Sequence, residues 1–218
     1  MNTQPNPGPL TAADVDGLRK CIAGAGVAVF PADTVYGLGC DPDSEPAVKR
    51  LYELKGRAPA RPAAVMFFAL DLALDALPEL GSREQGALRA LLPGPLTLLL
   101  PNPARRYPLA CGPDPSGVET LGLRVPSLAP SLTALAALER PLLQSSANLS
   151  GGPEARRLSD VPTSIRARAD LTLDGGELPG VASTVLDLRD YTRAGAWRIL
   201  REGPVGQAEI ERRLAVSA

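Results

Sequence analysis

The sequence predicts an α/β (α+β) fold, in which helices flank a twisted, mixed, open sheet, and three observations support this. Helical and strand-like segments follow one another in mixed order along the 218 residues. Several strand-like segments are continuous apolar runs, which are typical of strands covered on both faces. The 23 prolines and 21 glycines divide the chain into short elements without a fixed-period repeat or linker. We therefore expect a single domain over residues 10–218.

The amino-acid composition excludes several kinds of chemistry. With 44% hydrophobic and 22% charged residues, the chain has the profile of a water-soluble globular protein. It contains no histidine, and its three cysteines, Cys21, Cys40 and Cys111, form no CxxC pair. Zinc sites, histidine bases and histidine-dependent triads are excluded. No obvious cluster of carboxylates indicates a protein-ligated metal either, and we predict none. Any catalysis must use arginine, lysine, hydroxyl groups and carboxylates.

The charge and the hydropathy pattern limit the partners. The formal net charge of −1 gives the molecule no field that draws it onto nucleic acid or an anionic membrane. Residues 1–9 are polar and lack the basic start and apolar core of a signal peptide, so we expect a disordered lead-in. No apolar run approaches the ~20 residues of a membrane helix. We expect a cytoplasmic protein without membrane contact.

The first elements follow from capping and periodicity. Apolar residues at helical spacing predict a helix over residues 11–23, with Thr11 as its N-cap. Residues 27–30 are a short apolar run that predicts a strand, and the glycine-containing residues 33–39 predict a turn-rich segment. A second helix is predicted over residues 44–55.

The second helix has a cation at its C-terminal end. Its apolar spacing places Lys55 on the inward face, and Gly56 follows as a C-cap. Residues 63–68 predict a fully buried strand. Residues 82–92 predict a helix that Pro-Gly-Pro stops, and residues 96–100 predict another strand.

The second half of the chain supplies further strands. Residues 120–125 alternate as a half-buried strand should, residues 128–138 are helical in pattern, and residues 141–144 return to the sheet. The remaining elements are strands over residues 171–173, 184–188 and 197–200, and a helix over residues 206–214.

Three loops have a composition that suits ligand binding. In Thr34-Val-Tyr-Gly-Leu-Gly39 two glycines would let the backbone approach a ligand, although a plain turn after a strand also fits. Lys55-Gly-Arg57, with Arg61 nearby, is either a phosphate site or a solvated helix end. Ser145-Ser-Ala-Asn-Leu-Ser-Gly-Gly152 forms either an anion-binding nest or an ordinary turn.

Arg124 is a charged residue in an otherwise apolar strand. Its guanidinium faces either solvent or a ligand carboxylate or phosphate, and the sequence leaves both open. The chain contains no Walker GK[ST] pattern and no GxGxxG, which argues against P-loop and Rossmann nucleotide binding.

Taken together, these segments resemble the Sua5/YrdC family, the threonylcarbamoyl-AMP synthases. They occur in the family's order over residues 11–205, and we expect the short, single-domain form. The matching segments are Phe30-Pro-Ala-Asp-Thr-Val-Tyr-Gly-Leu-Gly39, Lys55-Gly-Arg57, Pro93-Gly-Pro-Leu-Thr97, Leu123-Arg-Val-Pro126, residues 141–151, Ser183-Thr-Val-Leu-Asp187 and Ile199-Leu-Arg-Glu-Gly203.

The resemblance implies a fold, a reaction and partners. The sheet would surround a deep, positively lined cavity, in which ATP, L-threonine and bicarbonate give L-threonylcarbamoyl-AMP and pyrophosphate. The product would serve the N6-threonylcarbamoyladenosine (t6A) modification of adenosine 37 in tRNA, which a separate transferase complex completes. Mg²⁺ would be held mainly by the ATP phosphates and water. A weak contact with RNA is left open.

The resemblance also implies roles for individual residues. Arg124 would clamp the threonine carboxylate, and Thr34 and Ser183 would line the amino-acid pocket. Lys55 and Arg57 would be catalytic, because they would stabilise the charge that develops on the α-phosphate. The contacts with ATP would come from Lys55, Arg57, Arg61, Thr120, Ser146, Asn148 and Arg201.

This sequence departs from the family pattern at several positions. Ala32-Asp33 stands where Thr-Glu is common, and Arg61 stands where asparagine is expected. Met66 stands where many relatives carry a histidine that faces threonine. The loss of that polar contact leaves the amino-acid selectivity open.

Two other functions fit the same fold. An RNA-binding or ribosome-associated module needs a basic concave surface and aromatic stacking platforms. The net charge of −1 and the content of 4% aromatic residues argue against this function. A carbamoyltransferase of the hydrogenase-maturation type would need zinc-finger-like and acylphosphatase segments, for which this sequence has no counterpart.

Overall fold

The computed structural model describes residues 8–56, 63–111 and 119–215, and the strands in this part of the chain form one mixed sheet. The order is β7-β1-β2-β6-β3-β5-β4-β8-β9, with parallel pairs β1/β7, β3/β5 and β4/β8 among antiparallel ones. The strands are β1 (Ala28–Pro31), β2 (Tyr36–Cys40), β3 (Ala64–Met66), β4 (Leu96–Pro101), β5 (Thr120–Arg124), β6 (Leu142–Ser146), β7 (Leu171–Thr172), β8 (Thr184–Asp187) and β9 (Arg198–Arg201). The predicted α/β class with a mixed sheet is confirmed.

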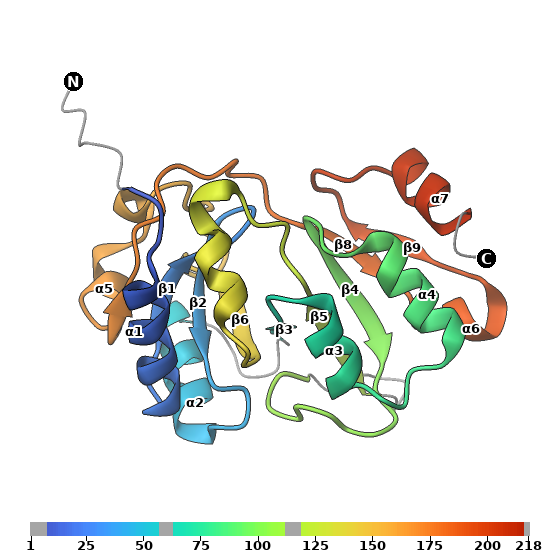
Figure 1. The fold of residues 1–218 in the computed structure, drawn as a ribbon, viewed down its shortest axis with the longest axis horizontal. Coiled ribbons are helices and arrows are strands. Elements are labelled where there is room, and N and C mark those ends of the chain that lie inside the picture. Colours follow the sequence, from blue (N-terminus) through green and yellow to red (C-terminus); the bar gives the residue numbers. More distant parts are fainter. Residues whose placement is uncertain (1–7, 57–62, 112–118, 216–218) are drawn as a thin grey trace.

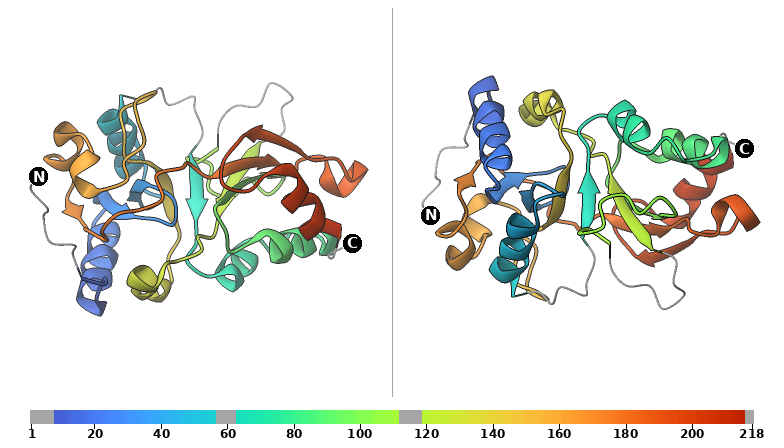
Figure 2. Two further views of the ribbon diagram at one scale, coloured as in Figure 1. Left: turned by 90° about the horizontal axis from the view of Figure 1, so that it is seen from above. Right: turned by 90° about the horizontal axis from the view of Figure 1, so that it is seen from below.

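Helices lie on both faces of this sheet. They are α1 (Ala12–Ala23), α2 (Glu45–Lys55), α3 (Leu70–Ala76), α4 (Ser82–Leu91), α5 (Thr163–Arg166), α6 (Tyr191–Ala194), α7 (Gln207–Ala215) and the 3-10 helices η1 (Pro130–Ala137) and η2 (Leu158–Asp160). Figure 1 shows α1, α2 and α5 around β1, β2 and β7, and α4, α6 and α7 around β4, β8 and β9. Figure 2 shows α1, η1, α3 and α4 on one face of the sheet and α2 on the other.

The first helix begins and packs as its sequence predicts. The Thr11 hydroxyl accepts a hydrogen bond from the backbone N–H of Asp14 at 3.3 Å, and the Asp14 carboxylate accepts one from the N–H of Thr11 at 2.7 Å. This reciprocal capping box satisfies two N–H groups that a helix terminus leaves unpaired. Val15, Leu18 and Ile22 are buried on one face. The predicted N-cap and apolar face are therefore confirmed.

The second helix ends at a left-handed glycine and buries its last residue. Gly56 has φ of +58°, and its N–H bonds to the carbonyls of the preceding turn. A residue with a Cβ adopts this conformation at a cost, which explains a glycine there. Lys55 is only 3% exposed, so the predicted inward orientation of its side chain is confirmed.

Some sequence predictions about local structure are wrong. The segment over residues 33–39 is not a turn throughout, because β2 starts at Tyr36 and pairs with β1 and β6. The strand predicted to be half-buried over residues 120–125 is instead buried at every position from Leu121 to Arg124. Within the predicted helix over residues 128–138, Pro130–Ala137 form a 3-10 helix in place of an α-helix.

Three short helices, α3, α5 and α6, have no counterpart in the sequence prediction. Each spans seven residues or fewer, too short for apolar periodicity to reveal it. None of the described helices has the length and apolar character needed to span a membrane.

Candidate functional site

A pocket of about 320 Å³ lies on one face of the central strands. Successive side chains of a strand point to opposite faces of a sheet, and alternate residues of neighbouring strands line this pocket. They include Ala64 of β3, Thr97 and Leu99 of β4, and Thr120, Gly122 and Arg124 of β5. Intervening residues such as Leu98, Leu121 and Leu123 belong to the hydrophobic core. The strand register thus separates the pocket from the core.

Arg124 lies in the pocket with most of its donors directed at protein acceptors. Its Nη2 donates to the Asp33 carboxylate at 2.6 Å and to the Thr34 hydroxyl at 3.3 Å, and its Nη1 donates to Gln144 Oε1 at 3.4 Å. The Nε–H is buried and has no hydrogen-bond partner among the described residues. Of the two orientations that the sequence left open, Arg124 faces the pocket and not the bulk solvent. It carries an unsatisfied donor that a ligand oxygen can satisfy.

Asp33 is the ion-pair partner of Arg124, a role that sequence reasoning missed. Its side chain is 3% exposed, and its second oxygen accepts a hydrogen bond from the N–H of Ser127 at 3.3 Å. Burial raises the pKa of the Asp33 carboxyl, and the Arg124 guanidinium opposes that shift. Burial likewise lowers the pKa of Arg124, against the charge of Asp33. The pair holds the guanidinium in one orientation.

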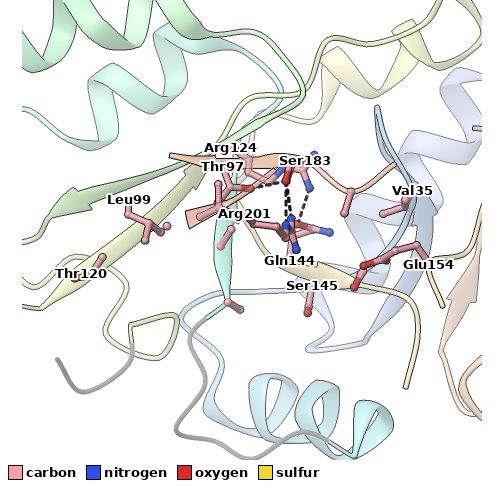
Figure 3. A pocket seen from close by; sticks show the side chains of 16 residues that line it. Val35, Thr97, Leu99, Thr120, Arg124, Gln144, Ser145, Glu154, Ser183 and Arg201 are labelled. Atoms are coloured by element: carbon pink, nitrogen blue, oxygen red, sulfur yellow. Dashed lines mark hydrogen bonds between the residues drawn. The ribbon is translucent and has the colours of Figure 1, made fainter. Parts of the chain in front are cut away.

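A second polar group gathers around Ser183, before β8. The Ser183 hydroxyl lies 2.8 Å from that of Thr97, and Arg201 Nη2 donates to the Ser183 carbonyl at 2.8 Å and to its hydroxyl at 3.2 Å. Figure 3 shows Thr97, Ser183, Arg201, Arg124 and Gln144 directed toward one another. The structure therefore brings together three predicted site residues, Arg124, Ser183 and Arg201, from segments distant in the sequence.

The chain after β9 passes very close to the start of β8. A Cβ at Gly203 would lie 2.4 Å from the backbone nitrogen of Thr184. Only glycine allows this approach. Gly203 thus keeps the end of β9, including Arg201, against Ser183.

Lys55 contacts the turn that follows β6. Its Nζ donates to the carbonyl of Ser146, and at 2.9 Å to both the carbonyl and the side-chain oxygen of Asn148. The Ser146 hydroxyl also donates to that Asn148 oxygen at 2.7 Å, and the Asn148 amide donates to the Gly152 carbonyl at 2.7 Å. In this structure Lys55 organises the predicted anion-binding turn. A contact between Lys55 and a phosphate stays a prediction.

Of the other residues predicted to contact the nucleotide, two line the pocket and two lie outside the described part of the chain. Thr120 lines the pocket, and its hydroxyl accepts a hydrogen bond from Arg189 Nη1 at 3.4 Å. Ser146 lines the pocket as well. Arg57 and Arg61 lie outside the described residues, so their predicted contacts are not placed.

The two glycines at residues 37 and 39 do not line the pocket. Both lie within β2, where a Cβ at Gly37 would come to 2.9 Å from Gln144 Nε2 and one at Gly39 to 2.8 Å from the Phe30 ring. Their lack of a side chain makes room for Gln144 and Phe30. Packing within the sheet therefore explains both glycines, and the close approach of their backbone to a ligand stays a prediction.

Sequence reasoning missed several pocket residues besides Asp33. Gln144 is buried, and a polar residue after the apolar pair Leu142-Leu143 was a signal that could have shown it. Thr97 belongs to the matching segment Pro93-Gly-Pro-Leu-Thr97, but the sequence analysis gives it no role in the site. Glu154 lines the pocket after a glycine- and proline-containing turn, and nothing in the sequence distinguishes it from a surface glutamate.

The arrangement can bind a small ligand that carries both charges. Arg124 and Arg201 supply cationic donors, the serine and threonine hydroxyls supply neutral ones, and Glu154 supplies an acceptor. Within the described ranges, no group of three or more cysteine, aspartate or glutamate side chains could hold a metal ion. Fold and site define an open mixed-sheet protein with a polar binding pocket on the sheet face.

The comparisons with known proteins give the family. The Sua5/YciO/YrdC family model, described as "Telomere recombination", matches residues 20–203. The chain belongs to this family, and the resemblance seen in the sequence is confirmed.

Named relatives and a solved structure agree with this assignment. A threonylcarbamoyl-AMP synthase of Xanthomonas campestris is 38% identical over 192 residues, which cover 87% of this chain and 97% of the relative. A threonylcarbamoyl-AMP synthase of Pyrococcus abyssi is 33% identical over 84% of this chain, but the match spans only 52% of that protein. The crystal structure of P. abyssi Sua5 complexed with L-threonine has a TM-score of 0.77 at 30% identity, covering 94% of this chain and 58% of that one.

Proposed function

We propose that this protein is an L-threonylcarbamoyladenylate synthase, which forms threonylcarbamoyl-AMP and pyrophosphate from ATP, L-threonine and bicarbonate. Family membership and the names of its relatives support this function. The observation that carries it is the buried Arg124, whose Nε–H has no partner in the described chain and which shares its pocket with Ser183 and Arg201.

Arg124 and its neighbours would hold the amino acid. A guanidinium binds a carboxylate well because its donors are planar and fixed, and Asp33, Thr34 and Gln144 hold this one in place. The hydroxyl pair of Thr97 and Ser183 is a donor and acceptor site for the threonine hydroxyl.

The nucleotide would lie along the turn after β6 and the start of β5. Ser146, Asn148 and Thr120 offer neutral donors, and Arg201 offers a cation. Arg57, Arg61 and Lys55 complete the predicted phosphate contacts. Lys55 would also support nucleotide binding indirectly, because its hydrogen bonds to Asn148 order the turn after β6.

The reaction needs positioning and charge neutralisation more than acid–base catalysis. The threonine amine adds to bicarbonate with loss of water, and an oxygen of the resulting carbamate attacks the α-phosphorus of ATP, from which pyrophosphate leaves. Holding the reactants together and stabilising charge at the α-phosphate supply most of the rate in such transfers. The absence of histidine from the sequence is compatible with this chemistry.

Magnesium would enter with ATP. Among the described carboxylates of the site, Asp33 is engaged by Arg124, which suits an ion held mainly by phosphates and water. When bound, Mg²⁺ would neutralise charge on the departing pyrophosphate. The product would pass to a separate tRNA threonylcarbamoyl transferase complex in the cytoplasm.

Pyrophosphate release tests the proposal. Purified protein is given ATP, Mg²⁺ and bicarbonate, with L-threonine, with L-serine or with no amino acid. Threonine-dependent release supports the synthase, and the serine arm shows whether Met66 alters selectivity. ATP binding without release under any condition would refute the proposal and favour an RNA-binding module of the same fold.

A further inference from the structure

Glu154 is a pocket residue without a role in the proposed reaction. It follows the turn after β6 and lines the pocket with Val35 and Ser145. Its Oε2 is buried and has no hydrogen-bond partner among the described residues. A carboxylate oxygen that is removed from water without a donor costs free energy, so this oxygen is a site for a donor on a ligand.

Backbone hydrogen bonds fix Glu154 beside the segment that carries Thr34. The N–H of Tyr36 donates to the carbonyl of Ala155 at 2.9 Å, which holds the chain at residue 154 against residues 34–36. Thr34 contacts Arg124 at 3.3 Å. Glu154 and Arg124 are therefore both held next to this segment, and Figure 3 shows the Glu154 carboxylate turned toward Gln144 and Ser145 inside the pocket.

The charges around Arg124 indicate what the donor is. Burial lowers the pKa of Arg124, the positive charge of Arg201 adds to that shift, and the negative charges of Asp33 and Glu154 oppose it. Asp33 is already paired with Arg124 at 2.6 Å, whereas the buried oxygen of Glu154 is unpaired. A pocket with an unsatisfied guanidinium N–H and an unsatisfied carboxylate oxygen matches a zwitterion, with a carboxylate at one end and an ammonium at the other.

We propose that Glu154 binds the amino group of the amino-acid substrate while Arg124 binds its carboxylate. The inference rests on the proposed function and adds a residue to it. An ammonium has three donors, and hydrogen bonds between charged groups are the stronger ones. Glu154 thereby selects an α-amino acid over an acid that lacks the amine, and it sets the position of the nitrogen that becomes carboxylated.

The test measures binding of two ligands that differ at this group. L-threonine is compared with 3-hydroxybutyrate, which keeps the carboxylate and the hydroxyl but lacks the amine. The proteins are the wild type, Glu154→Gln, Glu154→Asp and the control Glu139→Gln, in which an exposed glutamate is changed. Calorimetry gives both affinities, and ATP binding is measured with and without Mg²⁺.

We expect Glu154→Gln to weaken L-threonine binding roughly tenfold to hundredfold, as the loss of a hydrogen bond to a charged group does. In Glu154→Gln the affinities for 3-hydroxybutyrate and Mg-ATP stay unchanged. Glu154→Asp keeps part of the preference for threonine over 3-hydroxybutyrate. The control Glu139→Gln binds both ligands as the wild type does. Because Glu154 Oε2 has no hydrogen-bond partner among the described residues, Glu154→Gln should leave the melting temperature no lower than that of the wild type.

Three results would overturn the inference. They are unchanged threonine affinity in Glu154→Gln, equal loss of both ligands, and loss of Mg²⁺-dependent ATP binding with threonine binding intact, which would make Glu154 a magnesium ligand. Pyrophosphate release by the wild type is measured in parallel. Threonine-dependent release together with any of these three results leaves the proposed function standing and removes only the role of Glu154.

Discussion

Replacing Arg124 with methionine would leave the Asp33 carboxylate buried without its cation. The two side chains are 5% and 3% exposed, and their charged atoms lie 2.6 Å apart. Removing one partner of such a pair costs about 3–5 kcal/mol, because the remaining charge stays desolvated. At this chain length 1 kcal/mol shifts the melting temperature by about 2–4 °C. We therefore expect Arg124→Met to lower it by roughly 6–20 °C.

The matched control is the double variant Arg124→Met/Asp33→Asn. It removes the stranded charge, so most of the loss in melting temperature should be recovered, as followed by circular dichroism during heating. Without Arg124 the pKa of Asp33 rises further above its unfolded value. The deficit of the single variant should thus shrink as the pH falls and the carboxyl becomes protonated. A single variant as stable as the wild type, or a double variant no more stable than the single, would refute a buried charge pair.

Three further predictions concern other parts of the site. Lys55→Met removes the hydrogen bonds that order the turn at Asn148, so ATP affinity and pyrophosphate release should fall about tenfold or more while calorimetry shows unchanged threonine binding. Unaltered ATP affinity would contradict this. Gly203→Ala places a methyl 2.4 Å from a backbone nitrogen and should cost about 1–3 kcal/mol in urea denaturation, whereas Gly206→Ala, with nothing within 4 Å, should be close to neutral. Burial alone raises the pKa of Asp187, but hydrogen bonds from Arg189 hold it below its usual value. Its stabilisation is present above the unfolded pKa of about 3.9 and lost as pH falls through the folded one. Asp187→Asn should flatten the acid side of the stability profile, and an unchanged profile would exclude this contribution.

Elements with a local cause could be predicted from the sequence. The helix after Thr11 is defined by its cap and by an apolar face, and the helix before Gly56 by its periodicity and its left-handed glycine. The strand that begins at Tyr36 was missed, because its glycines suggested a turn. What makes it a strand is its pairing with β1 and β6, which no local pattern contains.

The sequence predicted site residues whose chemistry conflicts with their local pattern. Arg124 stands out because a cation in an apolar strand needs a partner. Its partner Asp33 and its neighbour Gln144 became visible only when the sheet brought three distant segments together. Glu154 gave no signal, since its burial depends entirely on the fold around it.

The pocket is built from strands whose neighbours in space are far apart in the chain. The parallel pairs β3/β5 and β4/β8 join residues 64–66 with 122–124 and residues 96–99 with 184–187. Contacts of such sequence separation form late and slow folding, because the long intervening loops must close first. A partly folded chain therefore lacks the complete pocket. Any ligand specific for it binds only the finished sheet and raises the stability of the whole sheet in proportion to the logarithm of its concentration.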